Sequence, residues 1–184
     1  MRPGTIIYKE KLKIGSVILR YPKKTDLKLL YRYINKLSRE RTFIIVQGER
    51  ISLKQEKRYL DNQLQKIKEG KAVQLVVFVN NELVGNSQIS LRGAIERHIG
   101  GFSISIAKKF RGQGLGKLLM KSVIAEAKKH LRGLEIIVLS VFADNEIAKK
   151  MYKKFGFRSY GMLPQGIKLE KGYANYIYMY KVTR

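Results

Sequence analysis

The chain has 184 residues, 45% of them hydrophobic, a length and composition typical of one globular domain. It contains no cysteine, which excludes a disulfide framework and a thiolate nucleophile. The formal net charge is +24, because 38 Lys and Arg stand against 14 Asp and Glu. No stretch is apolar for long enough to cross a bilayer, and the first residues lack the apolar segment of a signal peptide, so we expect a cytoplasmic protein with no membrane partner.

The positive charge leaves two interpretations open. A field of this sign attracts nucleic acids and other polyanions. The basic residues alternate with core positions instead of forming a tail, so they also fit a solvated surface without a specific role. A cationic substrate would be repelled unless it met a locally acidic site, and the sequence displays no such segment.

The first elements in the chain are predicted to be a strand pair and a helix. Alternating apolar residues predict a strand over Ile14 to Tyr21, with Thr5 to Lys9 as a candidate partner. Thr25 or Asp26 is expected to cap the helix, since each carries an oxygen that accepts a hydrogen bond from a helix N–H group. The apolar residues from Leu27 to Leu37 recur at helical spacing.

A second helix is predicted to begin after Ser52, which can form a capping box with Gln55. The apolar residues that follow share one helical face, and Gly70 is expected to end the helix. Residues 38–51, between the two helices, are expected to form a loop.

Three strands come next. Residues 72–79 and 83–91 are predicted to pair through a tight turn at Asn80 and Asn81, because asparagine tolerates the positive φ that such a turn requires. A loop then leads to a third strand, Ile99 to Ala107, whose apolar residues alternate.

The segment after this third strand predicts an anion-binding loop. Gly112, Gly114 and Gly116 lie where the strand passes into a helix. Free N–H groups at a helix start carry partial positive charge, glycine lets an anion approach closely, and Arg111 and Lys117 add formal charge. The spacing is neither G-x-x-x-x-G-K-[ST] nor G-x-G-x-x-G, which excludes the P-loop and the dinucleotide fingerprint. A tight Gly-rich turn without a ligand is the alternative.

A helix over Leu115 to Leu131 is predicted to connect two parallel strands. The second strand, Glu135 to Phe142, is almost entirely apolar, which predicts burial on both faces. Together with Ile99 to Ala107 these elements form a βαβ unit, in which the two strands run parallel.

The chain is predicted to end with a short helix and two strands. Asn145 is expected to cap the helix and Gly156 to end it. The strands are expected at roughly Phe157 to Met162 and Gly172 to Val182. No repeat or linker is visible, so we predict one α+β domain over residues 1–184.

Two motifs carry a resemblance to a known family. One is a loop of the form Arg/Gln-x-x-Gly-x-Gly/Ala, and the other is an Asn, an Ala and a Tyr on a short helix before Gly-Phe. The matching residues are Arg111, Gly114 and Gly116 for the first motif and Asn145, Ala148, Tyr152, Gly156 and Phe157 for the second. With both motifs in order, the chain resembles the GNAT superfamily of acyl-CoA-dependent N-acyltransferases over about residues 17–182.

The resemblance implies a mixed α/β fold: a twisted, mostly antiparallel sheet with a central parallel strand pair that splays apart, flanked by helices. Acetyl-CoA would bind there as acyl donor, and no metal is implied. The strand Ile99 to Ala107 is expected to be bulged, which would free an N–H group for the thioester oxygen. The implied contacts are main-chain groups of Ile104, Ser105 and Ile106, the loop residues Arg111, Gly112, Gln113, Gly114, Leu115, Gly116 and Lys117, and the second-motif residues Asn145, Ala148 and Tyr152.

Tyr152 is the residue that the resemblance assigns to catalysis. Direct attack of an amine on a thioester expels the CoA thiolate, and a positioned hydroxyl can protonate it as general acid. Its helical spacing alone would also fit a core aromatic. Asn145 is expected to contact pantetheine, to cap its helix, or to do both.

The general base is left open. An alkyl amine is protonated at neutral pH, since its pKa is about 10.4, and it must lose a proton before it attacks. Some proteins of this family place a glutamate five residues before the Asn of the second motif, but here that position is Ser140, which cannot act as a base. Glu96 or His98 could act directly or through water, although each also fits a structural or solvated role. A substrate that arrives as neutral amine needs no base.

The leading interpretation is an N-acetyltransferase that moves acetyl from acetyl-CoA to an amine, as a monomer or homodimer. The acceptor is a small molecule or a protein α-amine or lysine, and the sequence does not separate these. A basic module that binds nucleic acid or the ribosome on the same scaffold is the alternative. The acceptor groove is expected to use residues 38–51 and the last two strands. Four tyrosines there could line it or pack the sheet: Tyr173, Tyr176, Tyr178 and Tyr180.

Overall fold

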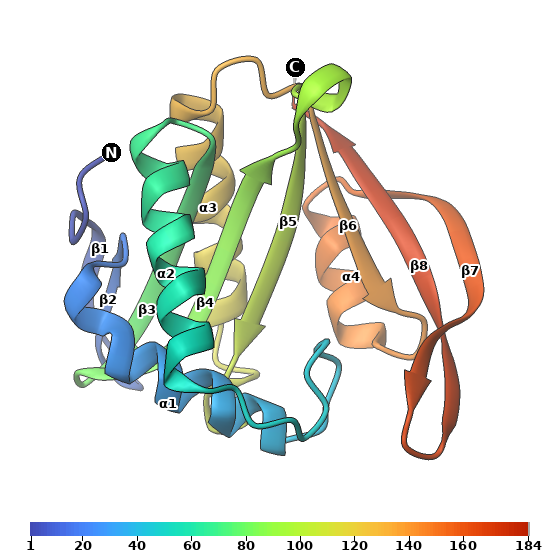
Figure 1. The fold of residues 1–184 in the computed structure, drawn as a ribbon, viewed down its shortest axis with the longest axis horizontal. Coiled ribbons are helices and arrows are strands. Elements are labelled where there is room, and N and C mark those ends of the chain that lie inside the picture. Colours follow the sequence, from blue (N-terminus) through green and yellow to red (C-terminus); the bar gives the residue numbers. More distant parts are fainter. Residues whose placement is uncertain (184) are drawn as a thin grey trace.

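The computed structural model describes residues 1–183, so residue 184, the last of the predicted domain, lies outside the described residues. Within them, eight strands form one sheet in the order β1-β2-β3-β4-β5-β6-β8-β7, with helices on both faces (Figure 1). The strands are β1 (Ile6–Leu12), β2 (Gly15–Arg20), β3 (Ala72–Val79), β4 (Glu82–Leu91), β5 (Ile99–Ile106), β6 (Ile136–Phe142), β7 (Arg158–Leu169) and β8 (Gly172–Val182). The helices are α1 (Leu27–Arg39), α2 (Leu53–Lys68), α3 (Leu115–His130) and α4 (Glu146–Lys154).

Neighbouring strands of the sheet are antiparallel, except for the central pair β5 and β6, which is parallel. This confirms the predicted mixed α/β fold. Helices α1 and α2 lie over one face of the N-terminal half of the sheet, and α3 lies over the opposite face (Figure 1). The core between these layers is apolar, and Val77, Leu119 and Met120 in it have no exposed surface. Burial of such side chains is the main driving force for this arrangement.

The caps and turns of the N-terminal half follow local sequence chemistry. Asn80 and Asn81 have φ angles of 48° and 67°, as predicted for the tight β3–β4 turn. At the start of α2, the Gln55 amide donates to Ser52 Oγ over 3.2 Å and the Ser52 amide donates to Gln55 Oε1 over 2.7 Å. The predicted capping box is therefore present.

The predicted cap of α1 is wrong. Asp26 precedes the helix, but its carboxylate makes no hydrogen bond to an α1 amide. Instead it accepts two hydrogen bonds of 2.7 Å from the Arg20 guanidinium and one of 2.8 Å from the Lys23 amide. Because Asp26 is 1% exposed, pairing with a cation keeps its buried charge tolerable, and this requirement outweighs helix capping.

Two predictions for the C-terminal half also need correction. Strand β6 is not buried on both faces: Leu139 and Val141 are buried, whereas Ser140 is exposed. The reason is that α1 and α2 cover only the other half of the sheet, which leaves one face of β6, β8 and β7 open (Figure 1). Strand β7 continues past Met162 to Leu169, with an irregularity between Leu163 and Ile167 that accommodates Pro164.

Strands β5 and β6 pair over only three residues on each strand. Ile99 to Gly101 pair with Ile136 to Val138, and beyond these positions the two strands diverge (Figure 1). The expected bulge in β5 is wrong, because β5 pairs with β4 in unbroken register from Gly100 to Ile106. The irregularity lies instead in β4, opposite Val77 and Phe78.

Gly100, in the short ladder, is closely surrounded by side chains of β4 and of the segment before β6. A Cβ atom there would lie 2.7 Å from Ile89 Cγ2 and 2.9 Å from Leu134 Cδ1, so Gly100→Ala should overpack the joint and destabilise the protein by roughly 1–3 kcal/mol. Gly101→Ala is the matched control, since its Cβ would meet only the Ser90 carbonyl at 3.9 Å. Urea unfolding of both variants measures the difference, and equal stabilities would contradict this account of the joint.

Candidate functional site

The candidate site is the gap that opens where β5 and β6 stop pairing. Both strands continue past their last paired residues, Gly101 and Val138, so the facing main-chain groups of β5 have no neighbouring strand there. The loop of the first motif follows β5 directly, and α4 of the second motif follows β6. The two motifs therefore meet at the open end of one gap (Figure 1).

The loop between β5 and α3 presents free amides. Gly112 and Gly114 have φ angles of 76° and 83°, the left-handed region that glycine adopts without strain. The first hydrogen bond of α3 runs from the Leu118 amide to the Gly114 carbonyl, over 3.1 Å. In the described part of the chain, the six amides from Gly112 to Lys117 have no hydrogen-bond partner, as befits an anion site at a helix start.

The Arg111 side chain, which was expected to add charge at the anion site, is bonded to other groups of the protein. Its Nε donates to the Ile106 carbonyl over 2.8 Å, and its guanidinium contacts the Glu40 carboxylate at 2.5 Å. Glu40 also accepts a hydrogen bond of 3.0 Å from the Lys108 amide. Arg111 thus ties the end of α1 to the loop, and Glu40 is a site residue that sequence reasoning missed, because nothing in the spacing of α1 indicates this contact.

Only part of the predicted pantetheine edge faces the gap. The Ser103 carbonyl and the Ala107 amide bond to β4, and the Ile99 carbonyl accepts from the residue that follows β4. Since main-chain direction alternates along a strand, the main chain of Ser105 also faces β4, and that of Ile104 and Ile106 faces the gap. The Ile106 carbonyl is already bonded to Arg111. Ile104 and the Ile106 amide remain available, whereas Ser105 contributes its side chain, 2.9 Å from the Tyr33 hydroxyl.

Asn145 caps α4 as predicted. Its Oδ1 accepts a hydrogen bond of 3.1 Å from the Ala148 amide. The side-chain amide group makes no hydrogen bond within residues 1–183 and is free to donate to a ligand in the gap. Capping and ligand contact are therefore compatible roles.

The side chain of Tyr152, on α4, reaches β5. Its ring contacts Phe102 edge-on, with centroids 6.0 Å apart, and lies 6.1 Å from the ring of Phe157. The residue is 7% exposed, and this burial raises the pKa of its hydroxyl to about 12. The side chain thus remains protonated at any physiological pH, as a proton donor must.

The structure does not bring Glu96 and His98 to this site. Glu96 is exposed and bonded to Arg92 at 2.8 Å. His98 immediately precedes the paired end of β5, and at about 3.3 Å per residue it lies roughly 20 Å along the strand from Ile104. Both residues are at the closed end of the gap.

A different acidic residue, Glu56, lies in the first turn of α2 and is 5% exposed. Its amide donates to the Ser52 carbonyl over 3.1 Å, and its carboxylate makes no ion pair among the described residues. Burial raises the pKa of its carboxyl group. Sequence reasoning missed Glu56, although its spacing from Leu60, Gln63 and Ile67 places it on the buried face of the helix.

The loop between α1 and α2 reaches across the open end of the gap. The ring of Phe43 contacts that of Phe142 at 5.5 Å, and Arg41 forms an ion pair with Glu170 in the β7–β8 turn. The loop over residues 38–51 thereby joins the two halves of the sheet. Of the four tyrosines assigned to the acceptor side, three make ring contacts along β8 and one, Tyr173, is 59% exposed.

Comparison with known families decides what kind of protein has this site. The model of the acetyltransferase (GNAT) family matches residues 32–157, which include both motifs and the gap. The chain belongs to this family.

Individual GNAT relatives support the assignment. L-amino acid N-acetyltransferase AaaT from Escherichia coli (strain K12) is 34% identical over 89 residues, which cover 48% of this chain and 54% of AaaT, so the match spans about half of each. A GNAT acetyltransferase from Streptococcus pneumoniae superimposes with a TM-score of 0.82 at 26% identity, over 90% of this chain and 99% of that one.

The GNAT fold also occurs with its cofactor bound. The structure of yncA from Salmonella typhimurium with acetyl-CoA has a TM-score of 0.78 over 91% of this chain and 94% of that one, at 16% identity. At this identity the likeness concerns the fold alone. No helix within residues 1–183 combines the length and the apolarity that crossing a membrane requires.

Proposed function

We propose that this GNAT protein transfers an acetyl group from acetyl-CoA to an amine. The observation that carries the proposal is the run of six unpaired amides at the start of α3, beside a strand edge that has lost its neighbour. The amides suit the pyrophosphate of CoA. The exposed edge of β5 suits the amides and carbonyls of pantetheine, which would add to it like a strand.

The thioester would lie near Ile104 and Tyr152. A main-chain amide of β5 that faces the gap can stabilise negative charge as it develops on the thioester oxygen. The amine attacks the carbonyl carbon, the C–N bond forms, the C–S bond breaks, and the protonated Tyr152 supplies the proton to the leaving sulfur. The chain has no cysteine that could carry the acetyl group, which favours direct transfer.

Donor and acceptor would approach from opposite faces of the sheet. The ring of Tyr152 packs on Phe102, whose side chain lies on the face that carries α3 and α4. The other face exposes Ser103 and partly exposes Ser105. We assign the acceptor to this second face, which residues 38–51 and the tyrosines of β8 border. The class of amine, free amino acid or protein α-amine or lysine, is to be found by screening acceptors for CoA thiol release.

Donor binding is tested by Gly114→Asp. The substitution strains a position with φ of 83° and places a negative charge at the anion site, so acetyl-CoA should no longer stabilise the protein. Wild type at about 100 times Kd should gain about 2.7 kcal/mol of stability. Gly133→Asp is the matched control, because Gly133 has φ of 77°, equally open surroundings and a place after α3, away from the gap. If both variants respond to acetyl-CoA as wild type does, the cofactor site is elsewhere.

Tyr152→Phe tests the general acid. The phenyl ring keeps the contacts with Phe102 and Phe157 but cannot donate a proton, so kcat should fall by about 10²-fold or more while the Kd for acetyl-CoA changes little. Stopped-flow thiol release and calorimetric titration measure the two quantities. An unchanged kcat would remove Tyr152 from the mechanism and leave it as a core aromatic.

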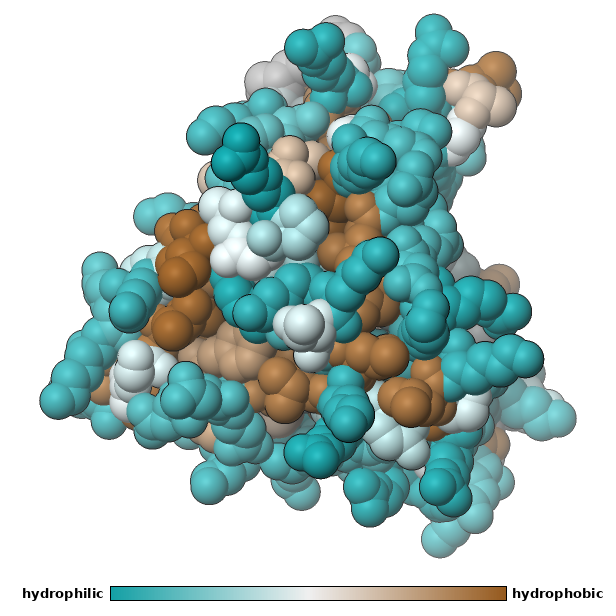
Figure 2. All heavy atoms as spheres, turned by 60° about the vertical axis from the view of Figure 1, so that its left-hand side comes forward, coloured by the Kyte–Doolittle hydropathy of each residue, from teal (hydrophilic) through white to brown (hydrophobic). Residues whose placement is uncertain are grey.

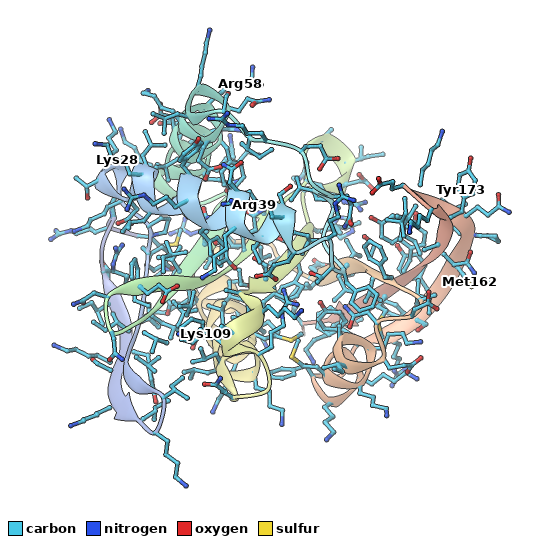
Figure 3. The ribbon with its side chains drawn as sticks, turned by 90° about the horizontal axis from the view of Figure 1, so that it is seen from below. Lys28, Arg39, Arg58, Lys109, Met162 and Tyr173 are labelled. Carbon is cyan, nitrogen blue, oxygen red and sulfur yellow. The ribbon has the colours of Figure 1, made fainter. Side chains whose placement is uncertain are left out.

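A nucleic-acid- or ribosome-associated role is a second candidate, favoured by the basic outer face of α1. Lys28, Arg32 and Arg39 are exposed there, and Figure 3 shows Lys28 and Arg39 along α1 on the same underside as Lys109. Hydrophilic side chains nevertheless cover most of the face seen in Figure 2, in keeping with a generally charged surface.

A salt series on RNA binding tests this second candidate. If α1 contacts phosphates, log Kobs for duplex RNA should fall steeply with log salt, and the double variant Lys28→Glu/Arg32→Glu should flatten the slope by about 1.4–1.8. The exposed pair Lys153→Glu/Lys154→Glu on α4 is the control for net charge. Equal slopes for both double variants would mean that α1 is no specific interface.

A further inference from the structure

Six aromatic side chains form a continuous row on the face that we assign to the acceptor. They come from the loop over residues 38–51 and from β6, β8 and β7, and successive ring centroids are 5.5 to 6.2 Å apart. Rings at such distances attract one another, so the side chains form one packed array. In the order of their contacts, the members of this ring row are Phe43, Phe142, Tyr176, Tyr178, Tyr160 and Tyr180.

Strand register places the ring row beside the gap. Tyr180 is the cross-strand partner of Val138, which in turn pairs with Gly101 at the end of the β5–β6 ladder. Tyr176 is the partner of Phe142, at the open end of β6. Paired residues share a face of the sheet, and adjacent strands lie about 5 Å apart. The ring row therefore borders the gap from its closed end to its open end.

The ring row is accessible because α1 and α2 cover only the other half of the sheet on this face (Figure 1). Tyr160 is 58% exposed and Phe43 is 49% exposed. In the part of the chain that the structure describes, the hydroxyls of the four tyrosines and of Ser103 and Ser140 have no hydrogen-bond partner. Contiguous exposed apolar surface is typical of a binding site, and the free hydroxyls add donors and acceptors for a polar chain.

The length of the ring row suits a chain of several residues. Tyr180 and Tyr176 are separated by four steps along β8, which is about 13 Å. An extended peptide advances by a similar distance per residue, so roughly four residues follow this length. A free amino acid or another small amine would contact only part of the row.

The charge on this face restricts the form in which an amine binds. The paired positions of β5, β6, β7 and β8 on this face contain no Asp, Glu or His, and Arg158, the partner of Tyr180, is exposed there. A bound ammonium would therefore find no carboxylate at these positions. The net charge of +24 also disfavours the protonated form of an amine that approaches. The face thus suits an amine that binds in its neutral form.

Amines differ in the amount of neutral form that they supply. The α-amine of a peptide has a pKa of about 7.7–8.0, whereas that of a lysine side chain is about 10.4. At pH 7.5 about one third of the former and only about 0.1% of the latter is neutral. Glu96 and His98, the candidate bases, lie at the closed end of the gap, so an acceptor that brings its own neutral amine fits the site better than lysine.

We propose that the acceptor is the α-amine at the N-terminus of a polypeptide, whose first residues lie along the ring row. The ammonium form gives its extra proton to bulk solvent, and the neutral amine attacks the thioester without a side-chain base. One of its two N–H protons stays on the new amide. The other replaces, through solvent, the proton that Tyr152 gives to the sulfur. This assignment rests on the proposed function and selects one of its acceptor classes.

Three acceptors test the amine class by thiol release at pH 7.5: unblocked tetra-alanine, free alanine, and an N-acetylated tetrapeptide with one lysine. We expect kcat/KM for tetra-alanine to exceed that for the other two by about tenfold or more, because only its amine is substantially neutral. Its kcat/KM should rise about tenfold per pH unit and level off near pH 8, at the pKa of the peptide amine itself.

The outcomes of this comparison are distinguishable. If alanine or the lysine peptide reacts as well as tetra-alanine, the assignment to a polypeptide α-amine is wrong while the acetyl transfer stands. A protein that binds acetyl-CoA but releases no thiol with any amine would refute the proposed function instead.

Tyr178→Ala and Tyr160→Ala test the ring row. Each variant removes one ring, so the KM for tetra-alanine should rise about fivefold or more, while the Kd for acetyl-CoA and kcat/KM for the single-residue acceptor alaninamide change little. Met162→Ala is the matched control and should behave as wild type. Met162 is 56% exposed on the same strand as Tyr160, but it pairs with Ile177 on the opposite face. Unchanged peptide kinetics in both tyrosine variants, or a loss confined to binding of single-stranded oligouridine, would overturn the proposal.

Discussion

The short ladder between β5 and β6 is the constraint on which the rest of this structure depends. Three residues on each strand hold the two halves of the sheet together, and Gly100 lets Ile89 and Leu134 pack closely beside this joint. If the ladder were longer, the edge of β5 would be satisfied by β6 and no ligand could pair with it. The candidate site therefore exists because the strands stop pairing. A second contact across the gap is the one between Phe43, in the loop over residues 38–51, and Phe142.

The positions of Tyr152 and the amides of residues 112–117 follow from this geometry. A loop after one diverging strand and a helix after the other must face a common opening, so two motifs far apart in the sequence lie beside one gap. The family assignment agrees with this layout, because the matched residues 32–157 contain both motifs. The proposed acceptor side has no comparable motif.

The sequence predicted the parts of the fold and site that depend on local chemistry. The turn at Asn80, the capping box at Ser52 and the cap at Asn145 each involve residues close in the chain, and each is present. Contacts between distant segments were not predictable in this way. Arg111 is bonded to Glu40, 71 residues away. The pairing of Asp26 with Arg20 spans only six residues, but it depends on the burial of Asp26, which the helix pattern does not reveal. The exposure of Ser140 depends on where α1 and α2 end over the sheet, which no pattern within β6 encodes.

The contact between Arg111 and Glu40 has a thermodynamic consequence. Glu40 lies at the end of α1, before residues 41–51, and Arg111 begins the loop that we propose for the donor phosphates. If donor phosphates changed the bonds of Arg111, the change would reach Glu40 and the loop beside the proposed acceptor face. Such a coupling free energy is reciprocal, so an acceptor that orders residues 41–51 would change donor affinity by the same factor. In the proposed reaction, donor and acceptor would then bind cooperatively without touching each other's recognition groups.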